Sequence, residues 1–187
     1  QINHNRRWHP EWILAADMLS AGVIGDLNYI RCSMDGGKPT PSWRSENEGP
    51  LLHDFTHYFD IMEWFAGDVS WLCGMAEQRV RPWAVEDFSA AIMKFSSGVT
   101  GIVHGAELSD YENHSFMLSG STGVINMQDE QVHLFQSHPG AVEGDSGFAW
   151  RELATVPVER PANTSTYCAA LDELLDVLDG SGMLRSD

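Results

Sequence analysis

The chain has 187 residues, of which 43% are hydrophobic, and it carries a formal net charge of −16. This length and apolar content suit one globular domain with a substantial core. The acidic excess disfavours nucleic acid and anionic membranes as partners, since both bind basic surfaces, and no apolar run approaches the about 20 residues of a membrane-spanning helix.

The cysteines and the first residues bear on the cellular compartment. Cys32, Cys73 and Cys168 are odd in number and far apart, without a CxxC pair, which favours reduced thiols over a disulfide framework or a zinc site. The opening residues, QINHNRRWHP, contain no apolar stretch of the secretory kind. We therefore expect a cytoplasmic protein. The chain begins at a glutamine and stops just after a helical pattern, which indicates a fragment of a longer protein.

The first part of the chain predicts a helix, a strand and a loop. Residues 9–21 place apolar side chains at helical spacing between Pro10 and Gly22, which are favoured near the start and past the end of a helix. Residues 26–34 contain aromatic and β-branched side chains and predict a strand. The glycines and prolines of the following GGKPTPSW predict a loop.

A second helix is predicted within EGPLLHDFTHYFDIMEWFAG, residues 48–67, and strand-like runs follow it. The predicted strands are 69–80, 87–95, 99–108, 114–120, 124–128, 131–136 and 148–156, of which the second and third form a hairpin. Residues 165–178 place leucines at helical spacing with acids between them and predict an amphipathic helix. This order predicts an α+β domain with helices on one face of a sheet.

The helix within residues 48–67 has two contrasting faces. At about 100° per residue, one stripe carries two imidazoles, a carboxylate and an indole: His53, His57, Asp60 and Trp64. The opposite face is apolar and is expected to pack on the sheet: Leu51, Phe55, Phe59, Met62 and Ala66. The helix N-terminus disfavours a second proton on the imidazoles, so a neutral proton acceptor is one interpretation. Ordinary capping or packing is the other.

A metal site is an alternative interpretation of the same stripe. HDFTH, residues 53–57, differs from the HExxH metal-binding motif by one methylene, and histidines at i and i+4 can share a metal. Asp60 would then be the third ligand of the metal, beside His53 and His57. Against this, the shorter acid would hold a general base back from a metal-bound water. The metal interpretation predicts a hydrolase or lyase. A third interpretation is a non-catalytic binding or dimerisation module, in which the stripe is inert.

The order of the sequence motifs resembles the C-terminal domain of the Gfo/Idh/MocA family, named for glucose-fructose oxidoreductase, inositol dehydrogenase and rhizopine catabolism. The resemblance covers roughly residues 1 to 130 and is carried by an ordered set of segments: NHNRRWHP, LSAGVIGDLNYI, SWRSENEGPLLHDFTHYFDIMEWFAGD, VEDFSAAIMKFSSGVTGIV and LSGSTGVINM.

The resemblance implies a fold and a missing partner domain. Family members join an N-terminal Rossmann domain to a C-terminal α+β domain, which resembles that of dihydrodipicolinate reductase. It is built on a large, mostly antiparallel β-sheet with helices on one face. Residues 1–187 are then a substrate-binding and oligomerisation domain, expected to form a homo-oligomer through the sheet face. NAD or NADP would bind the full-length protein. This chain has no GxGxxG motif, so we expect it to contain no cofactor-binding residue. We also expect the fragment alone to be inactive.

The resemblance also implies chemistry for the second helix. Family members oxidise a hydroxyl of a sugar, cyclitol or related polyol by hydride transfer, and a histidine near neutral pH suits the proton transfer. Alignment on HYFD makes His57 the counterpart of the family histidine. His53 stands where the family has an acid, four residues earlier, and Asp54 follows it. Either Asp54 orients His57, or His53 makes a different substrate contact. These three residues are the catalytic candidates.

The candidate substrate contacts lie on the same helix and in the segments leading to it. Trp43 could stack on a sugar face, and Arg44 could bind hydroxyl or carboxylate groups. Asp60 and Trp64 belong to the stripe, and Asp60 matches a family acid position. Arg7 lies in a segment that resembles one near the family's cleft. The alternatives are packing for Trp64, a surface ion pair for Arg44, capping or hydrogen bonding between helix and sheet for Asp60, and a solvated basic side chain for Arg7.

Overall fold

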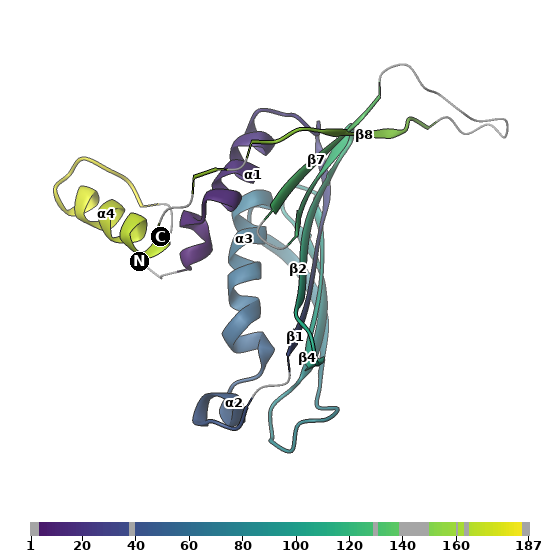
Figure 1. The fold of residues 1–187 in the computed structure, drawn as a ribbon, viewed down its shortest axis with the longest axis vertical. Coiled ribbons are helices and arrows are strands. Elements are labelled where there is room, and N and C mark those ends of the chain that lie inside the picture. The colour runs from purple at the N-terminus through teal and green to yellow at the C-terminus, as the bar shows by residue number, and fades with distance from the viewer. Residues whose placement is uncertain are drawn as a thin grey trace.

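The computed structural model (Figure 1) describes residues 4–37, 40–128, 131–138, 150–159, 161–162 and 165–184. The side chain of Arg44 is not described. An eight-stranded sheet has the order β2-β3-β4-β1-β5-β6-β7-β8. Strands β1 and β4 are parallel, and the other neighbouring pairs are antiparallel. The strands are β1 (Leu27–Gly37), β2 (Val69–Glu77), β3 (Phe88–Phe95), β4 (Thr100–Ser109), β5 (Asn113–Gly120), β6 (Gly123–Gln128), β7 (Gln131–Ser137) and β8 (Leu153–Val156).

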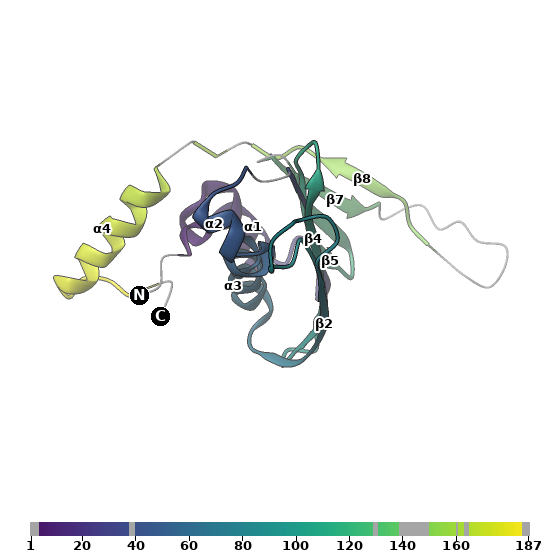
Figure 2. The same cartoon turned by 90° about the horizontal axis from the view of Figure 1, so that it is seen from below.

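The helical segments all lie on one side of this sheet, which confirms the predicted α+β class (Figures 1 and 2). They are the 3₁₀ helix η1 (Asn5–Trp8), α1 (Pro10–Ser20), α2 (Trp43–Asn47), the π-helix η2 (Leu51–Phe55), α3 (Thr56–Ala66) and α4 (Thr166–Leu178). Pro10 opens α1, and Gly67 ends α3 at a φ of 81° that favours glycine. Helix α4 stands away from the sheet, and Nε1 of Trp8 donates to Glu173 on it at 2.9 Å.

The core lies between the sheet and helices α1 and α3. Alternation along β1 turns Cys32 towards the helices, opposite Val103 on β4 and Phe116 on β5. The ring of Phe116 meets Trp12 edge-on at 4.8 Å between centroids and stacks on Tyr58 at 6.4 Å. This aromatic contact fixes both helices against the middle of the sheet.

The other face of the sheet carries large exposed apolar side chains. Register places Ile92 on β3 opposite Ile102 on β4, both facing away from the helices. The exposed fractions range from 38% to 56% for the set: Tyr29, Trp71, Met75, Ile92 and Ile102. We call these residues the open-face patch. Within the described ranges, no helix combines the length and the apolar character needed to cross a membrane.

Candidate active site

A cavity of about 440 Å³ opens where η1, the start of α3 and strands β5 and β6 come together. Its wall combines ionisable side chains from segments far apart in sequence: Arg6, His9, Asp54, His57 and His114. The aromatic side chains of Trp12, Tyr58 and Phe116 also line it. Burial raises the pKa of Tyr58 to about 12, so this phenol stays neutral near neutral pH. The arrangement offers several hydrogen-bonding groups beside flat apolar surface, a combination that suits small polar ligands.

His57 supplies a neutral imidazole to the cavity wall. Burial lowers its pKa below the ordinary 6.5, and the positive charges of Arg6 and His4 lower it further, against the opposing influence of Asp54 and Asp60. The His4 ring meets the His57 ring edge-on, with centroids 5.6 Å apart. Within the described structure, Nδ1 of His57 is buried without a hydrogen-bond partner. At neutral pH this side chain can therefore take up a proton.

Asp54 brings a carboxylate to the same wall. Burial alone would raise its pKa, but hydrogen bonding to His53 and electrostatic interactions with His53, Arg6 and His114 hold it below the ordinary value. Nε2 of His53 lies 3.1 Å from Oδ2 of Asp54. The site thus pairs an ionised carboxylate with a neutral imidazole, an arrangement that stabilises the imidazolium formed on proton uptake.

The side chain of His53 contacts a buried ion pair. Its Nε2 lies 2.5 Å from Oε1 of Glu107 on β4, and the guanidinium of Arg81 pairs with Oε2 of the same carboxylate. The side chains of Arg81 and Glu107 are 4% and 8% exposed. Neither belongs to the described lining of the cavity.

The single stripe predicted for the second helix was therefore wrong, and the π-helix is the reason. Residues 51–55 form η2, whose i→i+5 hydrogen bonds widen the turn, so spacing of about 100° per residue does not apply there. Asp54 consequently lines the cavity with His57, whereas His53 meets Glu107. The predicted apolar face also shifts, because Tyr58 and Ile61 are buried while Phe59 is only partly buried.

Three candidate substrate contacts meet one another rather than the cavity. Arg7 donates from Nε and Nη2 to the two oxygens of Asp60 at 2.8 and 3.0 Å. The same guanidinium lies 5.8 Å from the ring centroid of Trp64. None of the three is among the described residues that line the cavity. Their contacts join η1 to α3.

The two candidates on α2 give no support to a substrate role. The side chain of Trp43 is 74% exposed and is outside the described lining of the cavity. The side chain of Arg44 lies outside the described part of the structure. Their predicted contacts stay predictions.

The ligand atoms suited to a metal are not the predicted ones. Within the described residues, the ligand atoms of His53, Asp54 and Glu107 lie within 4.8 Å of one another. Asp60, the third ligand expected from the sequence, instead receives two hydrogen bonds from Arg7. The guanidinium of Arg81 already neutralises Glu107 and opposes a further cation there.

Sequence reasoning missed Glu107 and Arg81, and did not select Arg6 as a site residue. A signal for Glu107 was available, because it alternates with Val103 and Gly105 on the helix-facing side of a predicted strand. An acid in such a register is rarely buried without a partner. The partner could not be identified, because Arg81 lies in the loop between β2 and β3, where no periodic pattern indicates burial.

Comparisons with known proteins agree with this fold. The family described as GFO/IDH/MocA C-terminal domain matches residues 12–126. The chain is 27% identical to the uncharacterized oxidoreductase YdgJ of Escherichia coli (strain K12), over 97% of this chain and 56% of that protein. It is 34% identical over 68 residues to the rhizopine catabolism protein MocA of Rhizobium meliloti, which spans 36% of this chain and 22% of MocA.

Solved structures show the same fold at low sequence identity. Levoglucosan dehydrogenase in complex with NADH and L-sorbose superposes with a TM-score of 0.75 at 15% identity, covering 99% of this chain and 58% of that one. The WlbA dehydrogenase from Bordetella pertussis, in complex with NADH and UDP-GlcNAcA, gives 0.70 at 15% identity, covering 95% and 52%. In the matches that cover nearly all of this chain, it spans between 52% and 58% of the other protein's length. It belongs to the GFO/IDH/MocA C-terminal domain family.

Proposed function

We propose that this chain is the substrate-binding and oligomerisation domain of an NAD(P)-dependent oxidoreductase that oxidises a hydroxyl of a sugar, cyclitol or related polyol. The observation that carries this proposal is the neutral His57 beside the ionised Asp54 on the wall of a polar cavity. The dehydrogenases with the same fold include proteins in complex with NADH. An N-terminal dinucleotide-binding domain would precede the chain, whose own sequence lacks a GxGxxG phosphate cradle.

The residues of this chain would handle the proton of the reaction. The substrate hydroxyl group transfers its proton to His57. The carbon that carries this hydroxyl group becomes a carbonyl carbon. A bound nicotinamide would accept the hydride from that carbon. Asp54 stabilises the imidazolium, because its carboxylate raises the pKa of His57. Asp54 thereby takes the role that the family pattern gives to an acid at the position occupied here by His53.

The charges of the cavity favour a neutral polyhydroxyl substrate. The carboxylates of Glu11, Asp54 and Glu112 line it beside the single guanidinium of Arg6 in the described wall. Carboxylates accept hydrogen bonds from hydroxyl groups and repel an anionic substrate. The volume of about 440 Å³ lies in the range of small-molecule pockets.

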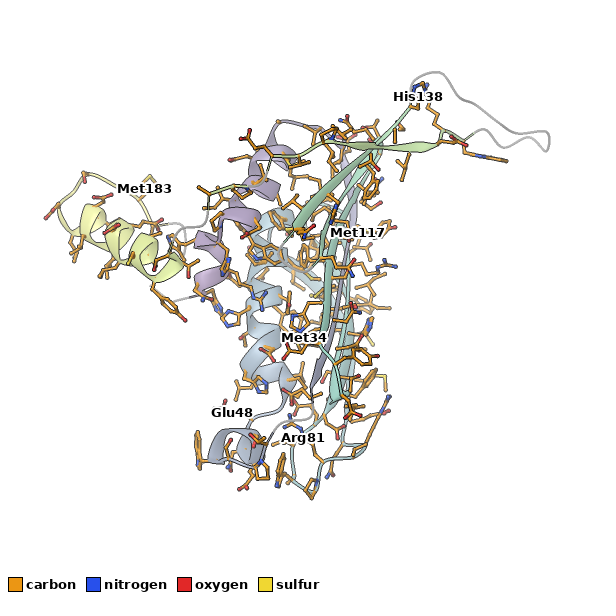
Figure 3. All side chains as sticks on the ribbon, viewed as in Figure 1. Met34, Glu48, Arg81, Met117, His138 and Met183 are labelled. Carbon is orange, nitrogen blue, oxygen red and sulfur yellow. The ribbon has the colours of Figure 1, made fainter. Side chains whose placement is uncertain are left out.

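The proposal is tested in the full-length protein by following NAD(P) reduction with a panel of sugars and cyclitols. His57→Ala is expected to lower kcat by about 10²–10⁴-fold, the usual contribution of a general base. His138→Ala is the control, because this exposed histidine follows β7, far from α3 (Figure 3). Wild-type turnover by His57→Ala, or no turnover of any polyol by the unaltered protein, contradicts the proposal.

We propose in addition that a second copy of the chain covers the open-face patch. The patch spans strands β1 to β4, of which β2 is the edge strand and the other three are paired with a neighbouring strand on both sides. Contiguous exposed apolar side chains of this kind mark association surfaces. A self-complementary contact through a two-fold axis is the commonest way to cover such a surface.

A further inference from the structure

We propose that Glu107 and Arg81 are positioning residues that hold His53, and through it Asp54, in the geometry of the active site. The inference rests on the proposed function and assigns roles to two buried charges that the mechanism leaves unused. Arg81 is 6% exposed and Glu107 is 7% exposed. Charges buried to this degree destabilise a protein unless each meets a partner. Here the partners form one connected path to the cavity wall.

The path begins at the ring of His53. Its Nε2 faces two carboxylates, at 2.5 Å from Oε1 of Glu107 and 3.1 Å from Oδ2 of Asp54. A ring nitrogen between two acceptors must carry the hydrogen. Within the described structure, Nδ1 of the same ring is buried without a partner. The surroundings therefore fix the tautomer with hydrogen on Nε2, which hydrogen-bonds to Glu107 and also lies beside the carboxylate of Asp54.

Glu107 in turn is held by Arg81. The guanidinium pairs with Oε2, which leaves Oε1 directed at His53. Nη1 of Arg81 also donates to the carbonyl oxygen of Ser45 at 3.0 Å and lies 3.4 Å from that of Glu48. Arg81 and Glu48 lie at the same end of the molecule, beside α2 (Figure 3). One side chain thus joins β4 to the segment that leads into η2.

A buried aspartate fixes the backbone that carries Arg81. The carboxylate of Asp87 accepts from the backbone N–H groups of Arg79, Val80 and Arg81 at 2.7, 2.8 and 2.7 Å. Burial would raise the pKa of Asp87, but these hydrogen bonds hold it below the ordinary value. The loop between β2 and β3 is therefore a rigid base for the guanidinium. The connected set runs from Asp87 through Arg81, Glu107 and His53 to Asp54.

A bound metal is the competing explanation for this cluster. Ligand atoms of His53, Asp54 and Glu107 lie close enough to share one ion. The geometry favours positioning, because the guanidinium of Arg81 sits on the carboxylate that would have to bind the ion. Metal analysis of the purified full-length protein separates the two explanations. We expect no stoichiometric metal, and one bound ion that is lost in Glu107→Leu would overturn the inference.

The kinetic test uses two substitutions of Glu107 in the full-length protein. Glu107→Leu is expected to lower kcat about 100-fold, the effect of a small misplacement of catalytic groups. The KM for the sugar should change less than about threefold, because Glu107 is outside the described cavity wall. Glu107→Gln keeps an acceptor for Nε2 of His53, so its kcat should be about tenfold higher than that of Glu107→Leu. It also carries the test if Glu107→Leu fails to fold.

The control removes an ion pair between the same two residue types in an exposed place. Glu77 pairs with Arg79 at 2.9 Å, but both side chains are more than 40% exposed. Glu77→Leu should leave kcat unchanged. Equal kcat in wild type and both Glu107 variants would overturn the inference.

A spectroscopic measurement separates this inference from the proposed function. Nitrogen NMR of histidine-labelled full-length protein reports which ring nitrogen of His53 carries hydrogen. We expect the Nε2–H form in the wild type and a mixture of both forms in Glu107→Leu. This result would support the positioning of His53 even if no polyol were oxidised. An unchanged His53 signal in Glu107→Leu would overturn the inference, whatever the activity.

Discussion

Arg7 and Asp60, 53 positions apart in the chain, form a two-point ion pair that ties η1 to α3. Their side chains are only 15% and 12% exposed. Arg6, the neighbour of Arg7, faces the cavity, so the ion pair sets the place of a site residue through the backbone. The sequence pattern had suggested substrate binding for both partners, whereas their contacts indicate support of the cavity wall.

Asp60→Asn should lower the free energy of unfolding by about 2 kcal/mol, because it replaces the ionised acceptor of a two-point, mostly buried ion pair with a neutral amide. Urea unfolding checks this value. Glu77→Gln is the control: it weakens an exposed ion pair and should lower the free energy of unfolding by less than about 1 kcal/mol. Equal losses in the two variants would show that the Arg7–Asp60 pair contributes no more than a surface contact.

The pH dependence of turnover should follow His57. Its pKa is below the ordinary 6.5, so kcat/KM should fall as pH drops through a value under 6.5. Arg6→Met removes a charge that lowers this pKa and should move the acid limb to higher pH. Asp54→Asn removes a charge that raises it and should move the limb to lower pH. Shifts in the same direction in both variants would contradict the assignment to His57.

The same lowered pKa has a consequence for stability. The folded protein binds a proton at His57 less readily than the unfolded chain, whose histidine has the ordinary pKa of 6.5. The contribution of His57 to the free energy of unfolding is therefore fully present above pH 6.5 and is lost as the pH falls through the pKa of the folded state. The free energies of unfolding of wild type and His57→Gln, measured in urea across this range, should therefore differ most above pH 6.5. The difference should become smaller as the pH falls below that value. A constant difference at all pH values would contradict the prediction.

Gly105 provides the space that Phe55 of η2 occupies. A Cβ atom there would meet the Phe55 ring at 2.3 Å and the carbonyl oxygen of Met34 at 3.0 Å. Gly105→Ala should cost about 1–3 kcal/mol and lower kcat, because Phe55 adjoins Asp54. Gly37→Ala is the control, since no atom of the described residues lies within 4 Å of its added Cβ. Thermal unfolding and turnover measure both effects, and two equally stable variants would contradict this reading.

The open-face patch should control association. Ile92→Lys places a charge in the middle of the patch and should weaken self-association by at least about tenfold, as hot-spot substitutions do. Light scattering after gel filtration measures the mass. Leu171→Lys on α4 alters a side chain of similar exposure, 55% against 50%, and should leave the mass unchanged. A monomeric wild type would contradict the proposed homo-oligomer.

Local patterns predicted most of the elements. Pro10 and Gly22 bracket α1, and the turn at Ser96, Ser97 and Gly98 separates β3 from β4 as the hairpin prediction required. These features depend on residues near one another in the chain, so sequence periodicity records them.

Contacts between distant residues were not predictable in the same way. Glu107 lies 54 positions from His53, and only the register of β4 against the helices brings them together. The π-helical turn at residues 51–55 likewise has no distinct pattern in the sequence, yet it decides that Asp54 rather than His53 lines the cavity. The resemblance selected His57 as a catalytic candidate, and the structure alone supplied its surroundings.

The parallel pairing of β1 with β4 has a consequence for how the chain folds. Strand β1 ends at Gly37, but its two neighbours are β4, which begins at Thr100, and β5, which ends at Gly120. Closing so long a loop before any contact forms costs chain entropy and slows folding. During synthesis, β1 therefore stays unpaired until the ribosome has released more than half of the domain.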